Sequence, residues 1–440
     1  METNNEGQTP KKMQWVIVGG SLGGLAAGIA LKALGYDTTI LERNPTPLLH
    51  DQGAGIVAGG DSLEFFERYN RCKQPIAVRS IRRQYLDREG NIVHQIESEQ
   101  DMSSWDLTYY IMRANYDGTA SAYCDVPPPD PAHGKAAHYH DRTVTAIEEL
   151  TDGSGLRVSW QQTSDPSTTG SLTADRVIGA DGPSSTVRSL FAPDVQRTYA
   201  GYCALRGTVP EGEATAATRA VFSERFTFYH GPGVQILAYL IPGVNGTVEP
   251  GHRLINFVYY TNFPAGSPEL DAILTDRLGR RRTITMPPGM TDPAAWQRQR
   301  DIARAVLPPP FAEVVCKAAR PFVQAVTDVL SPEHEFAGGK VVLIGDAIAG
   351  FRPHTVASTA QAALDAMLYA DYVAGRIGRA EWKRETMGYA RYIQRRGVDM
   401  GTRSQHLRLP LSEYIRDRDV ASTPRRDEVY PEWATAVDLM

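Results

Sequence analysis

The chain of 440 residues is 42% hydrophobic and 22% charged, which is typical of globular proteins and gives room for two or three domains. Its 46 basic and 51 acidic residues leave a net charge of −5, too small to indicate a nucleic-acid or membrane-surface partner. Residues 1–12 lack the apolar core of a signal peptide, and no apolar run is long enough to span a bilayer. We therefore predict a cytoplasmic protein with no nucleic-acid partner and no membrane span.

The sequence predicts no metal site. The four cysteines form no CxxC pair, so neither a zinc site nor a disulfide framework is indicated. His133, His138 and His140 lie close together in the chain, but no carboxylate or thiol is placed to complete a ligand set with them.

The stretch from Gln14 to Arg43 has the pattern of a βαβ unit. Residues 15–18 are predicted to be a buried strand, residues 19–24 a glycine-rich turn that opens a helix, and residues 38–41 a second strand. Glu42 follows the second strand, about 20 residues past the glycines, where an acid can accept hydrogen bonds from a ribose.

The glycine-rich turn allows two interpretations. Against the dinucleotide fingerprint GxGxxG, Gly19 and Gly24 match and Ser21 replaces the middle glycine. Glycines there let the backbone approach a pyrophosphate at the positive end of the helix dipole. However, Gly19, Ser21 and Gly23 also spell GxSxG, the nucleophile elbow of α/β-hydrolases. Both interpretations stay open from this motif alone.

The middle of the chain departs from the βα alternation. Residues 80–96 alternate like the two strands of a hairpin, and residues 199–260 contain strand patterns separated by glycine and proline turns. Between them, residues 105–123 are predicted to be helical, and residues 138–148 and 156–161 to form paired strands. These patterns predict a second, mainly antiparallel sheet.

Acidic residues follow three of the predicted parallel strands. Glu42 follows the predicted strand at residues 38–41, Asp181 follows the one at 176–180, and Asp346 follows the one at 340–344. Ligands bind outside the carboxyl ends of the strands in an open parallel sheet, so the three acids could converge on one nucleotide. An Asp at the end of a strand can instead cap the next helix.

Together these segments resemble the single-component FAD-dependent aromatic hydroxylases, which include para-hydroxybenzoate, salicylate and 2,6-dihydroxypyridine hydroxylases. The matching motifs are GGSLGG at 19–24, Arg113 after SWDLTYYIM, ADGPSSTVR at 180–188 and LIGDAIAGFRPHT at 343–355. The resemblance extends from about residue 13 to about residue 397 and is greatest to the dihydroxypyridine and salicylate hydroxylase-like branch, in which the GGS variant of the loop is usual. Further similar segments are YAGYCALRGTVPE at 199–211, ILAYLIPG at 236–243, NFVYY at 256–260 and PPPFAEVV at 308–315.

The resemblance implies that FAD is the cofactor. In this family, residues at the positions of Asp346 and Pro353 contact the ribityl chain and the flavin ring, and Asp181 belongs to a DG motif implicated in binding both FAD and the reduced nicotinamide. The implied cofactor-binding residues are Gly19, Ser21, Leu22, Gly24, Glu42, Arg43, Gly55, Arg113, Asp181, Gly345, Asp346, Pro353, Ala357 and Thr359.

The implied activity is FAD-dependent monooxygenation. NADPH or NADH reduces the flavin, O2 adds at C4a to give a hydroperoxide, and an electron-rich aromatic or N-heteroaromatic substrate takes up the distal oxygen. No metal is needed. A FAD-dependent epoxidase or oxidase of a secondary metabolite and an α/β-hydrolase with Ser21 as nucleophile are the alternatives, and a homodimer stays open.

Substrate contacts are expected on the antiparallel sheet. The predicted substrate residues are Tyr202, Arg206, Tyr229 and Tyr239. We hypothesise that His50 and His354 handle protons, because each lies in a glycine- or proline-shaped loop beside the expected flavin. A histidine that only fixes its loop is the alternative for His354. Ser358 stands where the family usually has glycine, and Leu205 replaces a frequent tryptophan, so both bear on substrate shape.

The predicted fold class is α/β, a Rossmann-like FAD-binding domain with an inserted, mainly antiparallel β-sheet substrate domain, as in para-hydroxybenzoate hydroxylase. The predicted domains are a discontinuous FAD-binding domain of residues 13–75, 101–198 and 328–400, a substrate domain of residues 76–100 and 199–327, and a C-terminal extension of residues 401–440.

Overall fold

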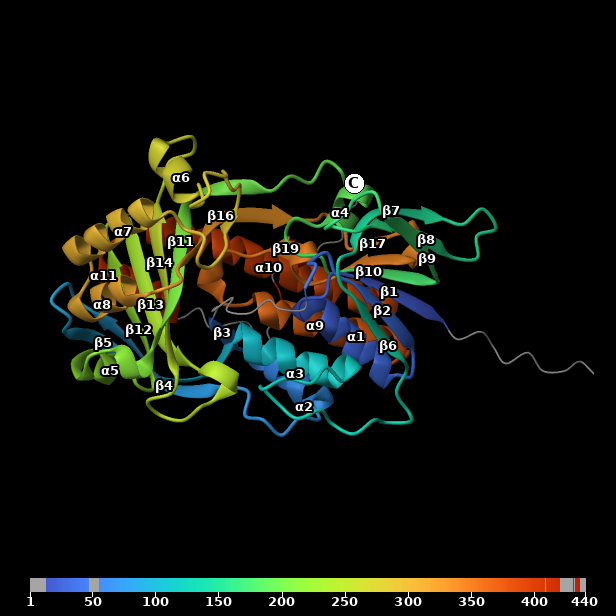
Figure 1. Ribbon diagram of the computed structural model, residues 1–440, viewed down its shortest axis with the longest axis horizontal. Coiled ribbons are helices and arrows are strands. Elements are labelled where there is room, and N and C mark those ends of the chain that lie inside the picture. The colour runs from blue at the N-terminus through green and yellow to red at the C-terminus, as the bar shows by residue number, and fades with distance from the viewer. Residues whose placement is uncertain (1–12, 47–54, 408, 420–429, 431, 436–440) are drawn as a thin grey trace, which may run out of the picture.

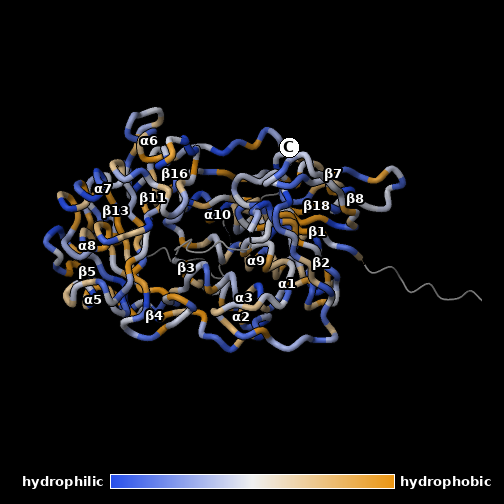
Figure 2. The backbone as a smooth tube through the Cα atoms, viewed as in Figure 1, coloured by the Kyte–Doolittle hydropathy of each residue, from blue (hydrophilic) through white to orange (hydrophobic). Residues whose placement is uncertain are grey.

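Two large sheets lie side by side in the computed structural model, which describes residues 13–46, 55–407, 409–419, 430 and 432–435 (Figure 1). One sheet has six strands and the other has ten, and a third, smaller sheet has three. Figure 2 shows hydrophobic residues concentrated along the strands of both large sheets, where the two main cores lie.

The six-stranded sheet has the order β17-β18-β10-β1-β2-β6 and is parallel except at the β17 edge. Helices α1, α3 and α9 pack on one face and the three-stranded sheet on the other, which explains why residues 15–18 are apolar on both faces. Its strands are β1 (Gln14–Val18), β2 (Asp37–Leu41), β6 (Ala136–Tyr139), β10 (Arg176–Gly179), β17 (Glu335–Phe336) and β18 (Val341–Leu343); the covering elements are α1 (Leu22–Ala33), α3 (Trp105–Asp117), α9 (Ser358–Val373), β7 (Thr143–Glu149), β8 (Leu156–Gln161) and β9 (Thr169–Ala174).

The ten-stranded sheet has the order β15-β16-β11-β14-β13-β12-β4-β5-β3, with β19 paired to β16. Its side chains alternate between two cores: on β13, Ile236 and Ala238 face the core under α5 to α8, whereas Leu237 and Tyr239 face the other side. Its elements are β3 (Gly55–Ala58), β4 (Val78–Leu86), β5 (Ile92–Ser104), β11 (Thr198–Pro210), β12 (Arg225–Gly231), β13 (Val234–Ile241), β14 (Leu254–Asn262), β15 (Thr285–Met286), β16 (Phe322–Leu330), β19 (Ala349–Gly350), α5 (Ala216–Phe222), α6 (Pro268–Ile273), α7 (Pro293–Val306) and α8 (Pro309–Lys317).

The long helix α10 (Arg379–Gln405) connects the two halves, since it packs against α9 of the parallel unit and against β13 and β16 of the large sheet. After it, α11 (Leu411–Asp419) places Tyr414 on the same face of β13 as Leu237 and Tyr239. The other helices are α2 (Gly60–Tyr69), α4 (Thr186–Phe191) and α12 (Glu432–Thr435).

Two predictions of local structure are wrong. The helix predicted over 105–123 ends at Asp117, because Gly118 adopts the left-handed conformation with φ of 70° that terminates a helix. The strand predicted over 138–148 is two strands: β6 joins the parallel sheet beside β2, and β7 pairs with β8. Asp141, with φ of 59°, breaks the extended chain between them.

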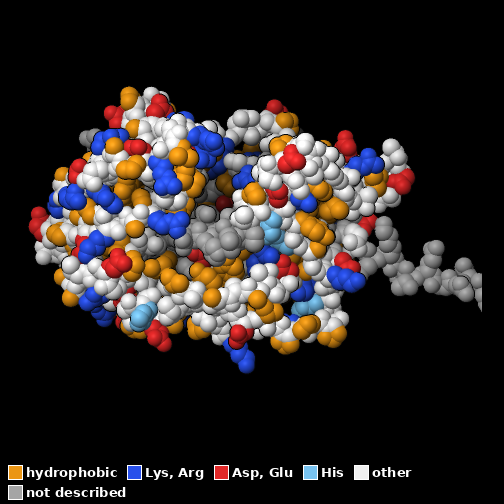
Figure 3. Space-filling model, in the orientation of Figure 1, with side chains coloured by type: hydrophobic (Ala, Val, Ile, Leu, Met, Phe, Trp, Pro, Cys, Tyr) orange, Lys and Arg blue, Asp and Glu red, His pale blue; other side chains and the backbone are white. Residues whose placement is uncertain are grey.

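On the face shown in Figure 3, the described Lys and Arg side chains are interspersed with acidic and apolar ones. Within the described ranges, no helix is both long and apolar enough to cross a bilayer, and no group of three His, Cys, Asp or Glu side chains could hold a metal ion. The domain boundaries stay a prediction.

Candidate active site

A cavity of about 330 Å³ lies between the parallel sheet and the large sheet. The segments that follow β1, β10 and β18, three neighbouring parallel strands, line one end, and β11, β13, β14 and β16 line the other. The structure thus brings together chain segments more than 300 residues apart, at the edge where ligands of such sheets bind. The cavity-lining residues include Ser21, Leu22, Gly23, Gly55, Trp105, Ala180, Gly182, Arg197, Arg206, Leu237, Tyr239, Val258, Tyr260, Gln324, Val326, Thr327, Gly345, Asp346, Pro353, Ala357, Ser358 and Thr359.

The glycine-rich loop requires its glycines for close backbone packing. Gly19 has φ of 103°, and a side chain there would overlap the Ala180 carbonyl group. A Cβ atom on Gly24 would overlap the Gly19 carbonyl oxygen. Ser21 is the N-cap residue of α1, but its hydroxyl caps no backbone N–H group, and Ser21 and Leu22 both line the cavity. The first turn of α1 is therefore open to an anionic ligand.

Glu42 holds the glycine-rich loop in place. Its Oε2 atom accepts a hydrogen bond of 2.7 Å from the Gly20 N–H group, and its Oε1 atom accepts one of 2.8 Å from the Asn44 N–H group. Glu42 is buried, whereas Arg43 is exposed, and neither lines the cavity.

Asp181 serves as a helix cap. Its carboxylate accepts hydrogen bonds from the N–H groups of Thr186, at 2.6 Å, and Val187, at 3.1 Å, and from the Ser185 hydroxyl group. Burial raises the pKa of Asp181, although these hydrogen bonds act in the opposite direction. Ala180 and Gly182, the neighbours of Asp181 in the chain, line the cavity, but Asp181 itself does not. The contacts of Asp181 are therefore those of a helix cap.

Asp346 lies in the cavity wall with unused hydrogen-bonding capacity. Its Oδ1 atom is buried and has no hydrogen-bond partner in the described part of the chain. Burial raises its pKa to about 6, while the Ser358 hydroxyl and the charge of Arg197 lower it in part. The preceding Gly345 N–H group donates a hydrogen bond of 2.8 Å to Asp365, so the turn that presents Asp346 is itself held by a buried acid.

The large sheet supplies Arg206 and Tyr239 to the cavity. One guanidinium nitrogen of Arg206 donates a hydrogen bond of 3.3 Å to the Gly55 carbonyl oxygen, and the group lies 5.2 Å from the centre of the Phe322 ring. Burial raises the pKa of Tyr239 to about 12, so its hydroxyl group stays protonated. The Gly55 N–H group donates a hydrogen bond of 3.0 Å to the Asn256 side chain.

Three other predicted substrate or catalytic residues, Tyr202, Tyr229 and His354, do not line the cavity. Tyr202 is buried and its hydroxyl group is 3.0 Å from Nε2 of His354, whose ring stacks on Tyr260 with 4.1 Å between ring centres. Neither His354 nor Tyr202 lines the cavity, and the same is true of Tyr229. His50 lies outside the described residues. The contacts of His354 therefore match a loop-fixing histidine, and its proton-handling role stays a hypothesis.

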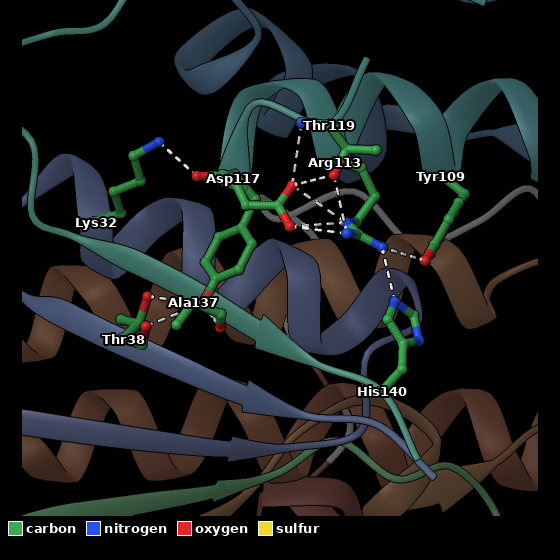
Figure 4. Close-up of polar contacts among 9 residues, drawn as sticks. Lys32, Thr38, Tyr109, Arg113, Asp117, Thr119, Ala137 and His140 are labelled. Atoms are coloured by element: carbon green, nitrogen blue, oxygen red, sulfur yellow. Dashed lines mark hydrogen bonds and ion pairs between the residues drawn. The ribbon is translucent and has the colours of Figure 1, made fainter. Parts of the chain in front are cut away.

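Arg113 lies on α3, next to the parallel sheet. Its guanidinium group forms an ion pair with Asp117 at 2.8 Å and donates a hydrogen bond of 2.7 Å to the Tyr109 hydroxyl group (Figure 4). His140 lies on its other side, with 3.4 Å between Nη1 of Arg113 and Nε2 of the imidazole. Arg113 does not line the cavity.

Sequence reasoning missed several cavity residues. Trp105, Arg197 and Gln324 line the cavity, and Arg197 donates hydrogen bonds to the side chains of Thr327 and Ser184. Trp105 lies within the SWDLTYYIM motif but was not predicted to line a site, and neither Arg197 nor Gln324 belongs to a motif named above. Gln324 and Val326 alternate on β16, so only the face of that strand could have been predicted.

Comparisons with known proteins agree with this architecture. A family model described as FAD binding domain-like matches residues 199–328. The 2,6-dihydroxypyridine 3-monooxygenase of Paenarthrobacter nicotinovorans is 28% identical over 366 residues, covering 82% of this chain and 83% of its own. The FAD-dependent urate hydroxylase of Klebsiella oxytoca is 25% identical, covering 76% of this chain and 74% of its own.

Solved structures show the same fold. The 2,6-dihydroxypyridine-3-hydroxylase of Arthrobacter nicotinovorans superposes with a TM-score of 0.77 at 25% identity, covering 90% of this chain and 94% of its own. Klebsiella pneumoniae HpxO, in a complex with FAD and uric acid, has a TM-score of 0.66 at 19% identity, covering 93% of both chains.

The predicted fold class is confirmed: this is a FAD-binding α/β protein of the para-hydroxybenzoate hydroxylase type, with a large, mainly antiparallel sheet beside its parallel sheet. The chain is similar to FAD-dependent monooxygenases of the aromatic hydroxylase family, as the sequence motifs predicted. This similarity argues against the hydrolase alternative, and among the described residues no histidine lines the cavity beside Ser21.

The cavity fits FAD in three respects. The open first turn of α1 offers N–H groups to a diphosphate, and the glycines bring the backbone within reach of it. Asp346 offers a carboxylate oxygen without a partner, which suits the hydroxyl groups of a ribityl chain. The adjoining wall of β13 and β14 is apolar and aromatic, as a flat ring system requires.

Proposed function

We propose that this protein uses NADPH or NADH and O2 to hydroxylate a small, electron-rich aromatic or N-heteroaromatic substrate. The observation that supports this most directly is the continuity of the cavity, which runs from the glycine-rich loop past Asp346 to Arg206 and Tyr239 on the large sheet. A cofactor end and a substrate end thus share one continuous cavity. The relatives named above act on single-ring or fused N-heteroaromatic compounds by their names, which agrees with a small substrate.

Arg206 favours a substrate with an acidic hydroxyl group or a ring that ionises readily. Its guanidinium group forms no ion pair with a carboxylate among the described residues, and its Nε atom is buried without a hydrogen bond. A partly buried cation without an anionic partner stabilises an anionic ligand. A phenolate or deprotonated hydroxypyridine is also more electron-rich than its neutral form, so Arg206 would hold the substrate in the form that attacks an electrophilic oxygen.

Tyr239 lies on the same face of the large sheet as Leu237 and can donate its proton to a substrate oxygen, since its raised pKa keeps it protonated. Leu237, Val258 and Val326 exclude water from this end of the cavity. When bound, FAD supplies the redox chemistry, taking electrons from NADPH or NADH and activating O2.

Turnover with a panel of substrates tests the proposal. Purified holoprotein is mixed with NADPH or NADH, O2 and either 2,6-dihydroxypyridine, other hydroxypyridines, uric acid or simple phenols. We expect at least one of these to stimulate nicotinamide oxidation with matching O2 uptake, and the product to gain one oxygen atom from isotopically labelled O2. Stimulated oxidation that releases only hydrogen peroxide would contradict hydroxylation of this substrate class, and an epoxide product would favour the epoxidase alternative.

A pair of variants tests the substrate end of the cavity. Replacing Arg206 by Gln removes the cation, and we expect KM to rise roughly 10- to 100-fold, the range given by losing a hydrogen bond to a charged group. Tyr229→Phe is the matched control, because Tyr229 lies on the same sheet but does not line the cavity. Equal KM values for the two variants would contradict the assignment of Arg206.

A further inference from the structure

Two histidines lie directly beside the glycine-rich loop, outside the cavity described above. His138 belongs to β6 and pairs with Ile40 of β2, the strand that leads into Glu42. His140 follows two residues later, and the two imidazole rings are 4.4 Å apart between centres and inclined by 36°. They form one compact unit, which we call the histidine pair.

His138 rests against the backbone of the loop. A Cβ atom on Gly20 would lie 2.5 Å from Nε2 of His138 and 2.9 Å from Cβ of Glu42. A larger residue at this position would therefore require the His138 ring to move, although the dinucleotide fingerprint leaves the position unrestricted. The imidazole of His138 is thus in van der Waals contact with the segment that binds a diphosphate in proteins of this fold.

The histidine pair has unused hydrogen-bonding capacity. Both ring nitrogens of His138 and the Nδ1 atom of His140 are buried and make no hydrogen bond of good geometry within the described part of the chain, although the Gly20 carbonyl group lies close to His138. Buried imidazole nitrogens without partners are uncommon unless a ligand or water supplies one.

The charges around the histidine pair come from two segments. Helix α3 contributes Arg113, which approaches His140 to 3.4 Å, and Asp117, which pairs with Arg113 (Figure 4). The end of β2 contributes Glu42, already engaged with the Gly20 N–H group. Burial is the main cause that lowers the pKa of His138, to about 3, with the charges of Arg113 and His140 adding to it; burial and Arg113 lower the pKa of His140 as well. Without a ligand, both rings are neutral at pH 7.

We propose that His138 and His140, together with Arg113, form part of the binding site for the diphosphate and adenosine ribose of FAD, and that FAD binding is coupled to uptake of a proton by this histidine pair. The two negative charges of the diphosphate offset the cation of Arg113 and favour an imidazolium ion beside the loop. The site then carries positive charge from α3 and from the end of β6, facing the positive end of α1.

The sign of the coupling follows from linkage. A ligand that raises the pKa of a group binds more tightly as the pH falls through the pKa of the complex. FAD is therefore expected to be held more tightly at pH 6 than at pH 8. The dissociation constant changes by up to about tenfold for each pH unit between pH 6 and the pKa that the pair has in the complex.

Release of FAD from diluted holoprotein, followed by flavin fluorescence, measures the dissociation constant between pH 6 and pH 8. We expect the wild-type constant to be roughly tenfold or more lower at pH 6, which requires the pKa of the pair in the complex to lie at least about one unit above pH 6. In the double variant H138Q/H140Q, which keeps polar side chains and removes the titration, the ratio is expected to fall below about twofold. His133→Gln is the control, since His133 faces Asp130 and not Arg113, and it should retain the wild-type ratio.

Calorimetry of FAD binding in two buffers of different ionisation enthalpy counts the proton. At pH 6.5, wild-type protein and the His133→Gln variant should take up as much as roughly one proton, and the double variant none. His140→Gln alone serves if the double variant does not fold, because His140 contacts Arg113 without supporting the loop. Proton uptake that persists in the histidine variants, or its absence in the wild type, would overturn the proposal.

Discussion

Replacing Asp346 by Asn is expected to stabilise the FAD-free protein while weakening its hold on FAD. The Asp346 carboxylate lies in the cavity wall with one oxygen buried and without a partner, and burial raises its pKa from 3.8 to about 6. The folded protein therefore disfavours the ionised form. Asn has nearly the same shape and carries no charge, so it removes this cost.

The pKa shift sets the magnitude and the pH range. A shift of about two units corresponds to at most about 3 kcal/mol, and because Asp346 borders the cavity, water there reduces this to about 2 kcal/mol. The folded-state pKa is above the unfolded-state value, so the wild type loses stability relative to Asp346→Asn as the pH rises from about 4 to about 6. The two proteins should be equally stable below pH 4 and differ by the full amount at pH 7.

Urea unfolding of the FAD-free proteins at a series of pH values gives the comparison. Glu211→Gln is the matched control with the opposite sign: burial alone would raise the pKa of Glu211, but its ion pair with Arg253 at 2.7 Å and the Gly251 N–H group lower it. That variant should lose about 1.5–3 kcal/mol at pH 7. If Asp346→Asn is less stable than the wild type at pH 7, or if its advantage is the same at pH 4, the reasoning is wrong.

Two further predictions concern the loop and the C-terminal helix. Gly24→Ala should abolish FAD retention, because the new methyl group overlaps the Gly19 carbonyl oxygen. Gly60→Ala is the control, since a methyl group there meets no atom within 4 Å, and this variant should purify with full flavin content. Equal flavin-to-protein absorbance ratios for the two variants would contradict the prediction. Tyr414→Phe removes the hydroxyl group that accepts a hydrogen bond from the buried Gln235 amide. Urea unfolding should show that the free energy of unfolding falls by about 1–3 kcal/mol. An unchanged midpoint would mean that this contact of α11 adds no stability.

The sequence predicted the parallel half of the fold well because its signals are local. The apolar strands, the glycine-rich turn and the acidic strand ends each lie within a few residues, and parallel strands bring their carboxyl ends to one edge. The cavity-lining turn with Asp346 could therefore be predicted. The sequence left open whether Asp181 binds a ligand or caps the next helix, because the N–H groups of Thr186 and Val187 become its neighbours only when α4 forms.

The substrate end of the cavity was harder to predict, because it depends on pairing between strands. Tyr239 lies opposite Asn256, and Leu237 opposite Val258, in a register fixed by the turns between β13 and β14. A shift of one residue would turn Tyr239 toward the other core. The same alternation along the strand places Tyr229 on the opposite face of the sheet, where it packs against the other core and does not line the cavity.

Three unfavourable features of the fold lie beside the expected FAD site. Asp346 has a carboxylate oxygen without a partner, His138 has two buried ring nitrogens without a hydrogen bond of good geometry, and the first turn of α1 lacks a side-chain cap. Each would cost stability in a protein without a ligand, since buried polar groups are normally satisfied. A diphosphate and a ribityl chain together supply acceptors and donors for all three. The same atoms that make the FAD-free protein less stable are therefore those that make it specific for this cofactor, while the apolar cores on either side, built on β1 and β13, hold them in position.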